Sequence, residues 1–467
     1  MSSGNTAAAS TEVADALGRA LGGRVEDFRR LSGGASRVTS SFDLIDDAGA
    51  RHRLVIQQDR GDGATRNGAV STEAALLEAA HRAGVPVAEV VASGEGEGLG
   101  ARWLVVTRVE GETIPRKILR DPEWEEARGL MTAQCGRALA AIHAIEPETV
   151  PGLSGTDPLA DPLPLLDALG EVRPALELGA RWLNAHRPAG GPRVTVHGDF
   201  RLGNLMVGPD GLRAVLDWEL AHVGDPLEDI GWLCAPAWRF GGAGRVGGFG
   251  DLSALLEAYE AAGGRTVDPV DVTWWEVHAT MKWAVVCGLQ VSAHLSGSTR
   301  SVELAAIGRR ICESEWDLLA LMGVGPEEPV APDPEPHRGP VAATTSPFGR
   351  PTAAELVEAV TEYLESGVME KSTGRGAFEA RVARNALQIA EREMRLGPGI
   401  AQDHVRRLAD LGVDSDGDLV AAIRAGRFDD DWQRVGAVLA ASARDQLRVA
   451  NPVYLERPRQ SGPGSPG

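Results

Sequence analysis

Three residues with oxygen-bearing side chains stand at a spacing that suits phosphate chemistry. Asp199 and Asn204 are five positions apart, and Asp217 follows after a short turn sequence. Phosphoryl transfer needs little covalent chemistry from the protein, but it needs an oriented nucleophile and metal ions across the phosphates. A carboxylate and an amide oxygen are hard ligands that suit Mg²⁺. The three residues are therefore candidates for a phosphoryl-transfer centre.

The elements around these residues are expected to bring them together. Residues 195–196 read as a short strand before the segment that holds Asp199, and residues 212–216 read as another strand. Gly208-Pro209-Asp210-Gly211 is a turn sequence that precedes the second strand. Protein kinases also place an aspartate five residues before a metal-binding asparagine and put a second metal-binding aspartate on a later strand. The hairpin is expected to return Asp217 to Asn204.

The amino-acid sequences of two segments resemble those of a known protein family. Residues 197–206 read HGDFRLGNLM, and residues 216–232 read LDWELAHVGDPLEDIGW. Both segments resemble those of the aminoglycoside phosphotransferase superfamily, and their sequences are most similar to the kinase domains associated with acyl-CoA dehydrogenases. The resemblance extends over about residues 25–322. The resemblance implies that Asp199 orients or deprotonates a substrate hydroxyl, and that Asn204 and Asp217 hold Mg²⁺. It also implies ATP as the phosphate donor.

Other polar residues of the two segments have supporting roles under this resemblance. His197 is expected to hold the loop rather than react. Asp225 and Asp229 are expected to anchor a loop and a helix N-terminus. Glu219 lies two residues from Asp217 on the same predicted strand face, where it could touch the metal through water. Trp232 is assigned to helix packing.

The region before residue 110 is predicted to be a small β-rich lobe. Its strands cover residues 38–45, 53–57, 87–92 and 103–109, and a helix covers residues 72–83. A glycine-containing loop resembles the one over the ATP phosphates, where small residues let backbone N–H groups approach an anion. Glu73 resembles the helix glutamate that pairs with a strand cation, and Thr107 to Val109 are expected to meet the adenine. The phosphate-loop candidates are Ser32, Gly33, Gly34 and Ser36.

Gln57 departs from the family pattern. Related kinases carry Lys or Arg near the end of the strand before the helix, and here that position reads Gln57. Arg53, Arg60 or Arg66 could supply the missing charge. Alternatively, the true register differs or the enzyme is slow, or the protein has drifted from ATP chemistry.

The expected fold class is α+β, a two-lobed protein-kinase-like fold followed by a separate all-α domain. Pro332, Pro334, Pro336 and Pro340 mark a linker before the last helical segments. The predicted divisions are an N-terminal segment 1–24, an N-lobe 25–110, a C-lobe 111–322, a Pro-rich linker 323–350, a helical domain 351–455 and a disordered tail 456–467.

Composition narrows the function classes. The net charge of -19 argues against sequence-independent nucleic-acid binding, which needs a basic surface. The four cysteines form no C-x-x-C pair, which suits a reducing cytoplasm, and the sequence predicts no membrane span. The C-terminal helices carry no chemical motif and are expected to serve as a lid, as a docking module for a protein partner, or in homo-oligomerisation.

The sequence thus predicts an ATP- and Mg²⁺-dependent phosphotransferase that acts on a hydroxyl group of a small molecule. The branch resemblance suggests a hydroxyacyl-CoA-like metabolite. One alternative is a catalytically weak or inactive kinase-like protein that binds a nucleotide or metabolite, which Gln57 motivates. A further alternative is an aminoglycoside kinase.

Overall fold

A computed structural model of the chain describes residues 3–31, 37–59, 70–96, 98–99, 102–155, 163–325 and 351–457. The chain forms two compact units, which are described separately. The first unit comprises Met1–Pro158, Ala189–Cys234 and Trp238–Val272. The second unit comprises Leu159–Pro188, Ala235–Ala237 and Thr273–Gly467.

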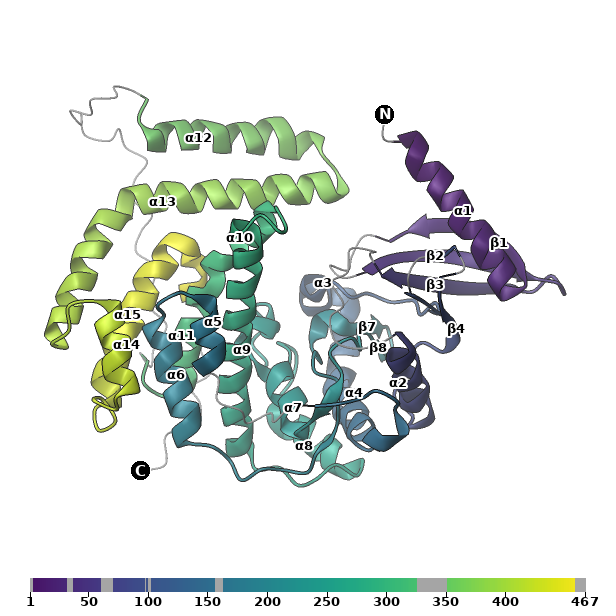
Figure 1. Ribbon diagram of the computed structural model, residues 1–467, viewed down its shortest axis with the longest axis horizontal. Coiled ribbons are helices and arrows are strands. Elements are labelled where there is room, and N and C mark those ends of the chain that lie inside the picture. Colours follow the sequence, from purple (N-terminus) through teal and green to yellow (C-terminus); the bar gives the residue numbers. More distant parts are fainter. Residues whose placement is uncertain are drawn as a thin grey trace. The chain divides into compact units, whose positions relative to one another are not determined.

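The first unit contains an antiparallel sheet with the strand order β1-β2-β3-β5-β4 (Figure 1). A buried cluster that includes Leu17, Phe42, Ile56 and Trp103 joins helix α1 to the sheet. Helix α2 stands between β3 and β4 in the chain, as the sequence predicts. These elements are α1 (Ser3–Leu21), β1 (Gly23–Arg30), β2 (Arg37–Asp46), β3 (Arg51–Asp59), α2 (Val70–Arg82), β4 (Val90–Glu95) and β5 (Arg102–Thr107).

Strand β1 was missing from the predicted order of elements. Its sequence, GRVEDFRR, is mostly charged, and none of its residues is fully buried. β1 is an edge strand that pairs only with β2 in the described sheet. Edge strands often carry charged side chains, so the alternation of apolar and polar residues that reveals an inner strand is weak here.

The remainder of the first unit contains two short strand pairs and several helices. Strand β7 pairs antiparallel with β8, and the turn lies between Gly208 and Gly211 as predicted. Strand β6 pairs with β9, and α4 packs against α8 and β8. These elements are α3 (Pro115–Arg120), α4 (Glu125–His143), β6 (Val194–Val196), β7 (Leu205–Gly208), β8 (Gly211–Val215), β9 (His222–Gly224), α7 (Pro226–Cys234) and α8 (Leu252–Ala261).

The second unit is helical and combines helices that precede the linker with those that follow it. Helix α15 packs on α11, α14 packs on α6, and α13 packs on both α10 and α12 (Figure 1). Helix α9 begins in the first unit and continues in the second. The helices are α5 (Leu163–Leu169), α6 (Pro174–Ala185), α9 (Pro269–Leu295), α10 (Val302–Ile307), α11 (Ile311–Leu321), α12 (Ala353–Tyr363), α13 (Gly374–Asp410), α14 (Asp416–Arg424) and α15 (Trp432–Ala450).

Helix α13 corrects one sequence-based division. The sequence suggests separate helices over residues 376–394 and 402–411, and Pro398 lies between these two ranges. The structure shows a single helix of 37 residues with Pro398 inside it. Proline removes one backbone hydrogen bond and kinks a helix without always ending it, and α13 bends along its length (Figure 1).

Among the described helices, none is both long and apolar enough to cross a lipid bilayer.

Candidate active site

Asp199 is held by three N–H donors. Its Oδ1 accepts hydrogen bonds from Arg201 Nε at 2.9 Å and Trp232 Nε1 at 2.8 Å. Its Oδ2 accepts a hydrogen bond from Asn204 Nδ2 at 2.6 Å. The residue is 9% exposed, so the carboxylate is nearly buried in a fixed orientation. Such a group can orient a hydroxyl and accept its proton.

Asn204 is oriented by the same contacts. Its Nδ2 also donates to the backbone oxygen of Asp199 at 3.0 Å. Both amide hydrogens are thereby committed to Asp199, and the amide oxygen of Asn204 has no hydrogen-bond partner among the described residues. That oxygen is left as a candidate metal ligand. Asn204 lies in a 3₁₀ turn (Leu202–Asn204) that leads directly into β7.

His197 and Asp229 form the buried support of the loop. Asp229 is fully buried and accepts hydrogen bonds from the backbone N–H groups of His197 at 2.7 Å and Gly198 at 2.8 Å. Burial favours a raised pKa for Asp229, but His143 and these backbone donors outweigh it and lower the pKa below its usual value. Asp229 thus anchors the loop from helix α7.

His197 itself lies inside the protein. Its Nδ1 faces the backbone N–H of Asp199 at 3.2 Å, and its Nε2 lies 3.0 Å from the carbonyl oxygen of Leu216. Because an N–H must donate to Nδ1, the ring proton is on Nε2 and is donated to Leu216. Burial lowers the pKa of His197. The histidine therefore joins the Asp199 loop to the end of β8, and both of its ring nitrogens contact backbone groups.

Asp217 reaches the site through the hairpin and an unusual backbone conformation. The N–H of Leu216 donates to the carbonyl oxygen of Asn204 at 2.8 Å, which fixes the end of β8 against the Asn204 turn. Asp217 then adopts a φ of 64°, in the left-handed region that non-glycine residues rarely occupy. Strained backbone of this kind clusters at functional sites.

The acidic environment of Asp217 fits a cation. Surrounding protein displaces water from its carboxylate, and Glu219 and Asp199 add like charge, so that its pKa rises to about 7. The residue is nevertheless exposed to solvent, which leaves a path for an ion. The described residues contain no group of three or more His, Cys, Asp and Glu side chains placed to hold a metal. Asp217 and Asn204 would provide one carboxylate and one amide oxygen, and Mg²⁺ commonly takes its remaining ligands from phosphates and water.

Glu219 does not lie where the sequence placed it. Strand β8 ends at Val215, and Glu219 lies in a turn rather than on a strand face shared with Asp217. The left-handed conformation of Asp217 ends the strand alternation that the prediction assumed. Glu219 is still close enough to Asp217 to contribute to its raised pKa.

The cation opposite Glu73 comes from β2. Arg37 forms an ion pair with Glu73 through Nη1 and a second pair with Asp59 at 3.3 Å. The same Nη1 lies 3.4 Å from Gln57 Oε1. Burial favours a lower pKa for Arg37, but Glu73 and Asp59 raise it, so the guanidinium is charged. The charge that Gln57 lacks is therefore supplied from the neighbouring strand.

The arginines considered from the sequence do not fill this role in the described part of the chain. Arg53 pairs with Glu110 at 3.0 Å, and its side chain is 61% exposed. Arg60 and Arg66 lie outside the described residues, as do Ser32, Gly33, Gly34 and Ser36 of the predicted phosphate loop.

The residues predicted to meet the adenine differ in their backbone hydrogen bonds. Thr107 is the last residue of β5, and it exchanges hydrogen bonds with Glu89 through its N–H and its hydroxyl, each at 2.9 Å. Val109 is half-buried, and its backbone makes no hydrogen bond to a described residue. The backbone of Val109 is thus free to face an adenine edge.

Three residues contribute to the candidate site although the sequence did not predict it. Arg37 follows the glycine-containing loop, and only the β2–β3 pairing of Arg37 with Asp59 shows that it lies near Gln57. Trp232 was assigned to packing, but its indole N–H donates to Asp199. The third residue is Arg201, whose guanidinium also stacks over the ring of Trp238, 4.7 Å from the ring centroid. Its position two residues after Asp199 was the one available signal.

The β-rich lobe, the hairpin and the Asp199–Asn204 pair define a protein of kinase-like fold. The chain belongs to the phosphotransferase enzyme family, whose model matches residues 27–272. Residues 370–454 match a second model, described as a domain of unknown function (DUF6285). The predicted family and fold class are thereby confirmed.

The chain is also similar to individual relatives, and its fold is similar to that of a solved structure. Acyl-CoA dehydrogenase family member 10 of Mus musculus is 30% identical over 183 residues, which cover 36% of this chain and 16% of that protein. Acyl-CoA dehydrogenase family member 11 of Homo sapiens is 42% identical over 60 residues, which cover 12% of this chain and 8% of that protein. The chain thus spans less than a fifth of these relatives. A crystal structure of a candidate aminoglycoside phosphotransferase from Ralstonia eutropha has a TM-score of 0.52 and 22% identity, and covers 67% of this chain and 96% of its own.

Proposed function

We propose that the chain transfers the terminal phosphoryl group of ATP to a hydroxyl group of a small molecule. The observation that carries this proposal is the Asp199 carboxylate, fixed by Arg201, Trp232 and Asn204 beside the hairpin that presents Asp217. Family membership supports the reaction class.

Each residue has a distinct part in the proposed reaction. Asp199 orients the acceptor hydroxyl and accepts its proton at a carboxylate oxygen. Asn204 and Asp217 would hold Mg²⁺, and the ion would supply positive charge to offset that of the phosphates. Asp229 and His197 keep the loop rigid, so that Asp199 needs little reorganisation when substrate binds.

We further propose that Arg37 and Glu73 form the cation–glutamate pair that positions the nucleotide phosphates. The pair interacts electrostatically with the candidate site. Glu73 contributes to the raised pKa of Asp217, and Glu219 contributes to that of Arg37. An arginine fork suits phosphate oxygens. This pair removes the reason for preferring a non-catalytic binding protein, which was the uncharged Gln57. Val109 is proposed to meet the adenine, and Ser32, Gly33, Gly34 and Ser36 the phosphates.

The acceptor is proposed to be a hydroxylated metabolite of the hydroxyacyl-CoA type. Partial similarity to two acyl-CoA dehydrogenase family members supports this class. Consumption of ATP should be measured against hydroxyacyl-CoAs, amino alcohols, sugars and aminoglycosides. Turnover only with aminoglycosides would contradict the proposed acceptor while leaving the phosphotransferase assignment intact.

The catalytic role is tested with Asp199→Ala. Phosphoryl transfer should fall by about 10² to 10⁴, because general-base catalysis contributes factors of this size, while Mg-ATP should still raise the melting temperature. Asp210→Asn is a matched control, since Asp210 lies in the hairpin turn with a side chain that is 70% exposed. Full activity of Asp199→Ala would refute the role, and equal loss in both variants would indicate damage to the hairpin instead.

A further inference from the structure

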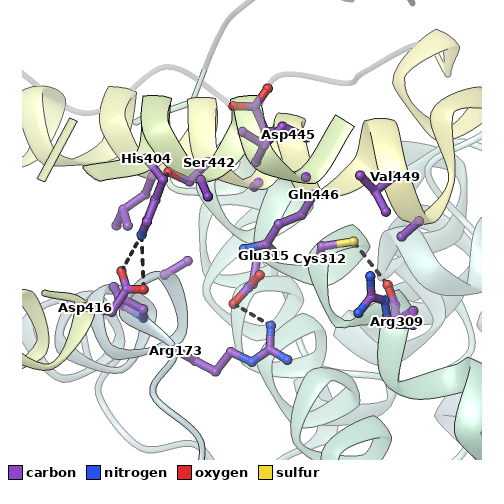
Figure 2. Close-up of a pocket in the computed structure, with 18 of the residues that line it drawn as sticks. Arg173, Arg309, Cys312, Glu315, His404, Asp416, Ser442, Asp445, Gln446 and Val449 are labelled. Atoms are coloured by element: carbon purple, nitrogen blue, oxygen red, sulfur yellow. Dashed lines mark hydrogen bonds and ion pairs between the residues drawn. The ribbon is translucent and has the colours of Figure 1, made fainter. Parts of the chain in front are cut away.

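A cavity of about 430 Å³ lies within the second unit (Figure 2). Its walls come from the start of α6, from α11 with the turn before it, and from α13, α14 and α15. Small-molecule pockets in proteins commonly enclose about 300–1,000 Å³. The cavity combines residues on both sides of the linker, so that neither family model covers all of it.

Much of the cavity wall is apolar, and most of its charges are paired with one another. Ile400, Leu439, Ala443 and Val449 supply aliphatic surface. The charged and polar side chains form three sets: Arg407 with Asp445 at 2.8 Å, Arg309 with Glu393, and His404 with Asp416 and Ser442 at 3.1 Å each.

Glu315 is paired less closely than the acids of these three sets. Its side chain is 5% exposed, and its described partner is Arg173 at 3.7 Å, which is beyond hydrogen-bond distance. Arg173 donates instead to Glu171, at 2.8 and 3.0 Å. No described residue donates a hydrogen bond to the Glu315 carboxylate. Figure 2 shows this carboxylate between α11 and Arg173, among the residues that line the cavity.

A buried carboxylate without a hydrogen-bond donor is costly and calls for a partner. Burial raises the pKa of Glu315, and Arg173 only opposes that rise. An ammonium group would supply both charge and donors. The aliphatic residues that line the same cavity would accommodate a short hydrocarbon chain, because burying apolar surface is favourable.

We propose that this cavity binds a small aliphatic primary amine, with its ammonium group against Glu315 and its carbon chain against Ile400, Leu439 and Val449. The site is distinct in its residues from the Asp199 centre, and the proposal does not depend on the phosphotransferase assignment. Because α6 and α11 share this wall with α13 and α15, a bound amine would connect the helices before the linker with those after it.

The test uses the full-length protein and n-butylamine, with n-butanol as the uncharged probe of equal chain length. Isothermal titration calorimetry at constant ionic strength should show saturable binding of n-butylamine and much weaker binding of n-butanol. Glu315→Gln keeps the shape of the side chain but removes its charge, and should weaken n-butylamine binding about 10- to 100-fold. Glu393→Gln, at an acid of the same cavity that is 55% exposed, should change binding less than about threefold.

A second variant separates the cavity from the charge. Ala401 lines the cavity and is exposed, so Ala401→Phe should block the space without disturbing a packed core. It should abolish binding although Glu315 is intact. The proposal is overturned if n-butylamine shows no saturable binding, if n-butanol binds equally well, or if both Glu315→Gln and Ala401→Phe bind like the wild type.

Discussion

Replacing Arg37 with glutamine tests how the nucleotide lobe replaces its missing strand cation. The side chains of Arg37 and Glu73 are 15% and 8% exposed, so the substitution leaves Glu73 buried and unpaired. Removing one partner of a buried ion pair costs about 3–5 kcal/mol. We take the lower end, about 3 kcal/mol, because the Arg37 side chain is partly exposed. In a unit of this size that corresponds to a fall in melting temperature of about 6–12 °C.

The loss should depend on pH with a defined sign. Burial raises the pKa of Glu73, and Arg37 opposes that rise. Without Arg37 the pKa of Glu73 rises further, and a group with a raised folded-state pKa contributes stability at low pH that is lost as pH increases. Arg37→Gln should therefore be less destabilised, relative to the wild type, at pH 5 than at pH 8. Urea unfolding at both values measures the difference.

Catalysis supplies an independent measurement. The lost charge-assisted contacts to phosphate should reduce kcat/KM for ATP by about 10- to 100-fold. Adding Gln57→Arg to Arg37→Gln returns a cation to the adjacent strand, two residues from the position opposite Arg37, and should recover much of this loss. Adding Glu73→Gln instead should restore stability without restoring kcat/KM. Unchanged stability and unchanged kcat/KM in Arg37→Gln would refute the reasoning.

Three further perturbations address the metal site, the catalytic loop and the C-terminal helices. Asp217→Asn should reduce phosphoryl transfer by about 10²-fold or more and raise the Mg²⁺ concentration needed for half-maximal rate; a normal Mg²⁺ titration would exclude Asp217 as a ligand. Asp229→Asn should cost about 3–5 kcal/mol, because an amide cannot accept from both backbone N–H groups and also pair with His143. Since the pKa of Asp229 is lowered, this cost should be full above about pH 4 and shrink in acid, as measured by urea unfolding. Arg424→Gln loses contacts to Glu177 at 2.9 and 2.5 Å and should increase amide exchange in α14 relative to α4, whereas uniform exchange would show that the contact does not hold α14 in place.

Local sequence patterns predict much of the fold for identifiable reasons. The inner strands β2 and β3 and the helix α2 were predicted over residues 38–45, 53–57 and 72–83, close to their observed bounds. The hairpin turn could be predicted from the sequence because glycine and proline favour turns. Strand β1 was not predicted, because its charged residues at the sheet edge do not alternate between apolar and polar. Helix α13 was predicted as two separate helices, because a residue such as Pro398 disfavours a helix interior in the local sequence.

The sequence by itself identified the candidate residues of the proposed reaction centre: Asp199, Asn204 and Asp217 follow from residue type, spacing and the intervening turn. Only the tertiary structure decided what surrounds them. The pairing of β2 with β3 brings Arg37 beside Gln57, and the fold brings Trp232 to Asp199 from 33 positions away. The left-handed backbone of Asp217 removes Glu219 from the predicted strand. Spacing along the chain specifies contacts within one turn or hairpin, whereas a charge or donor supplied by another element depends on how the elements pack.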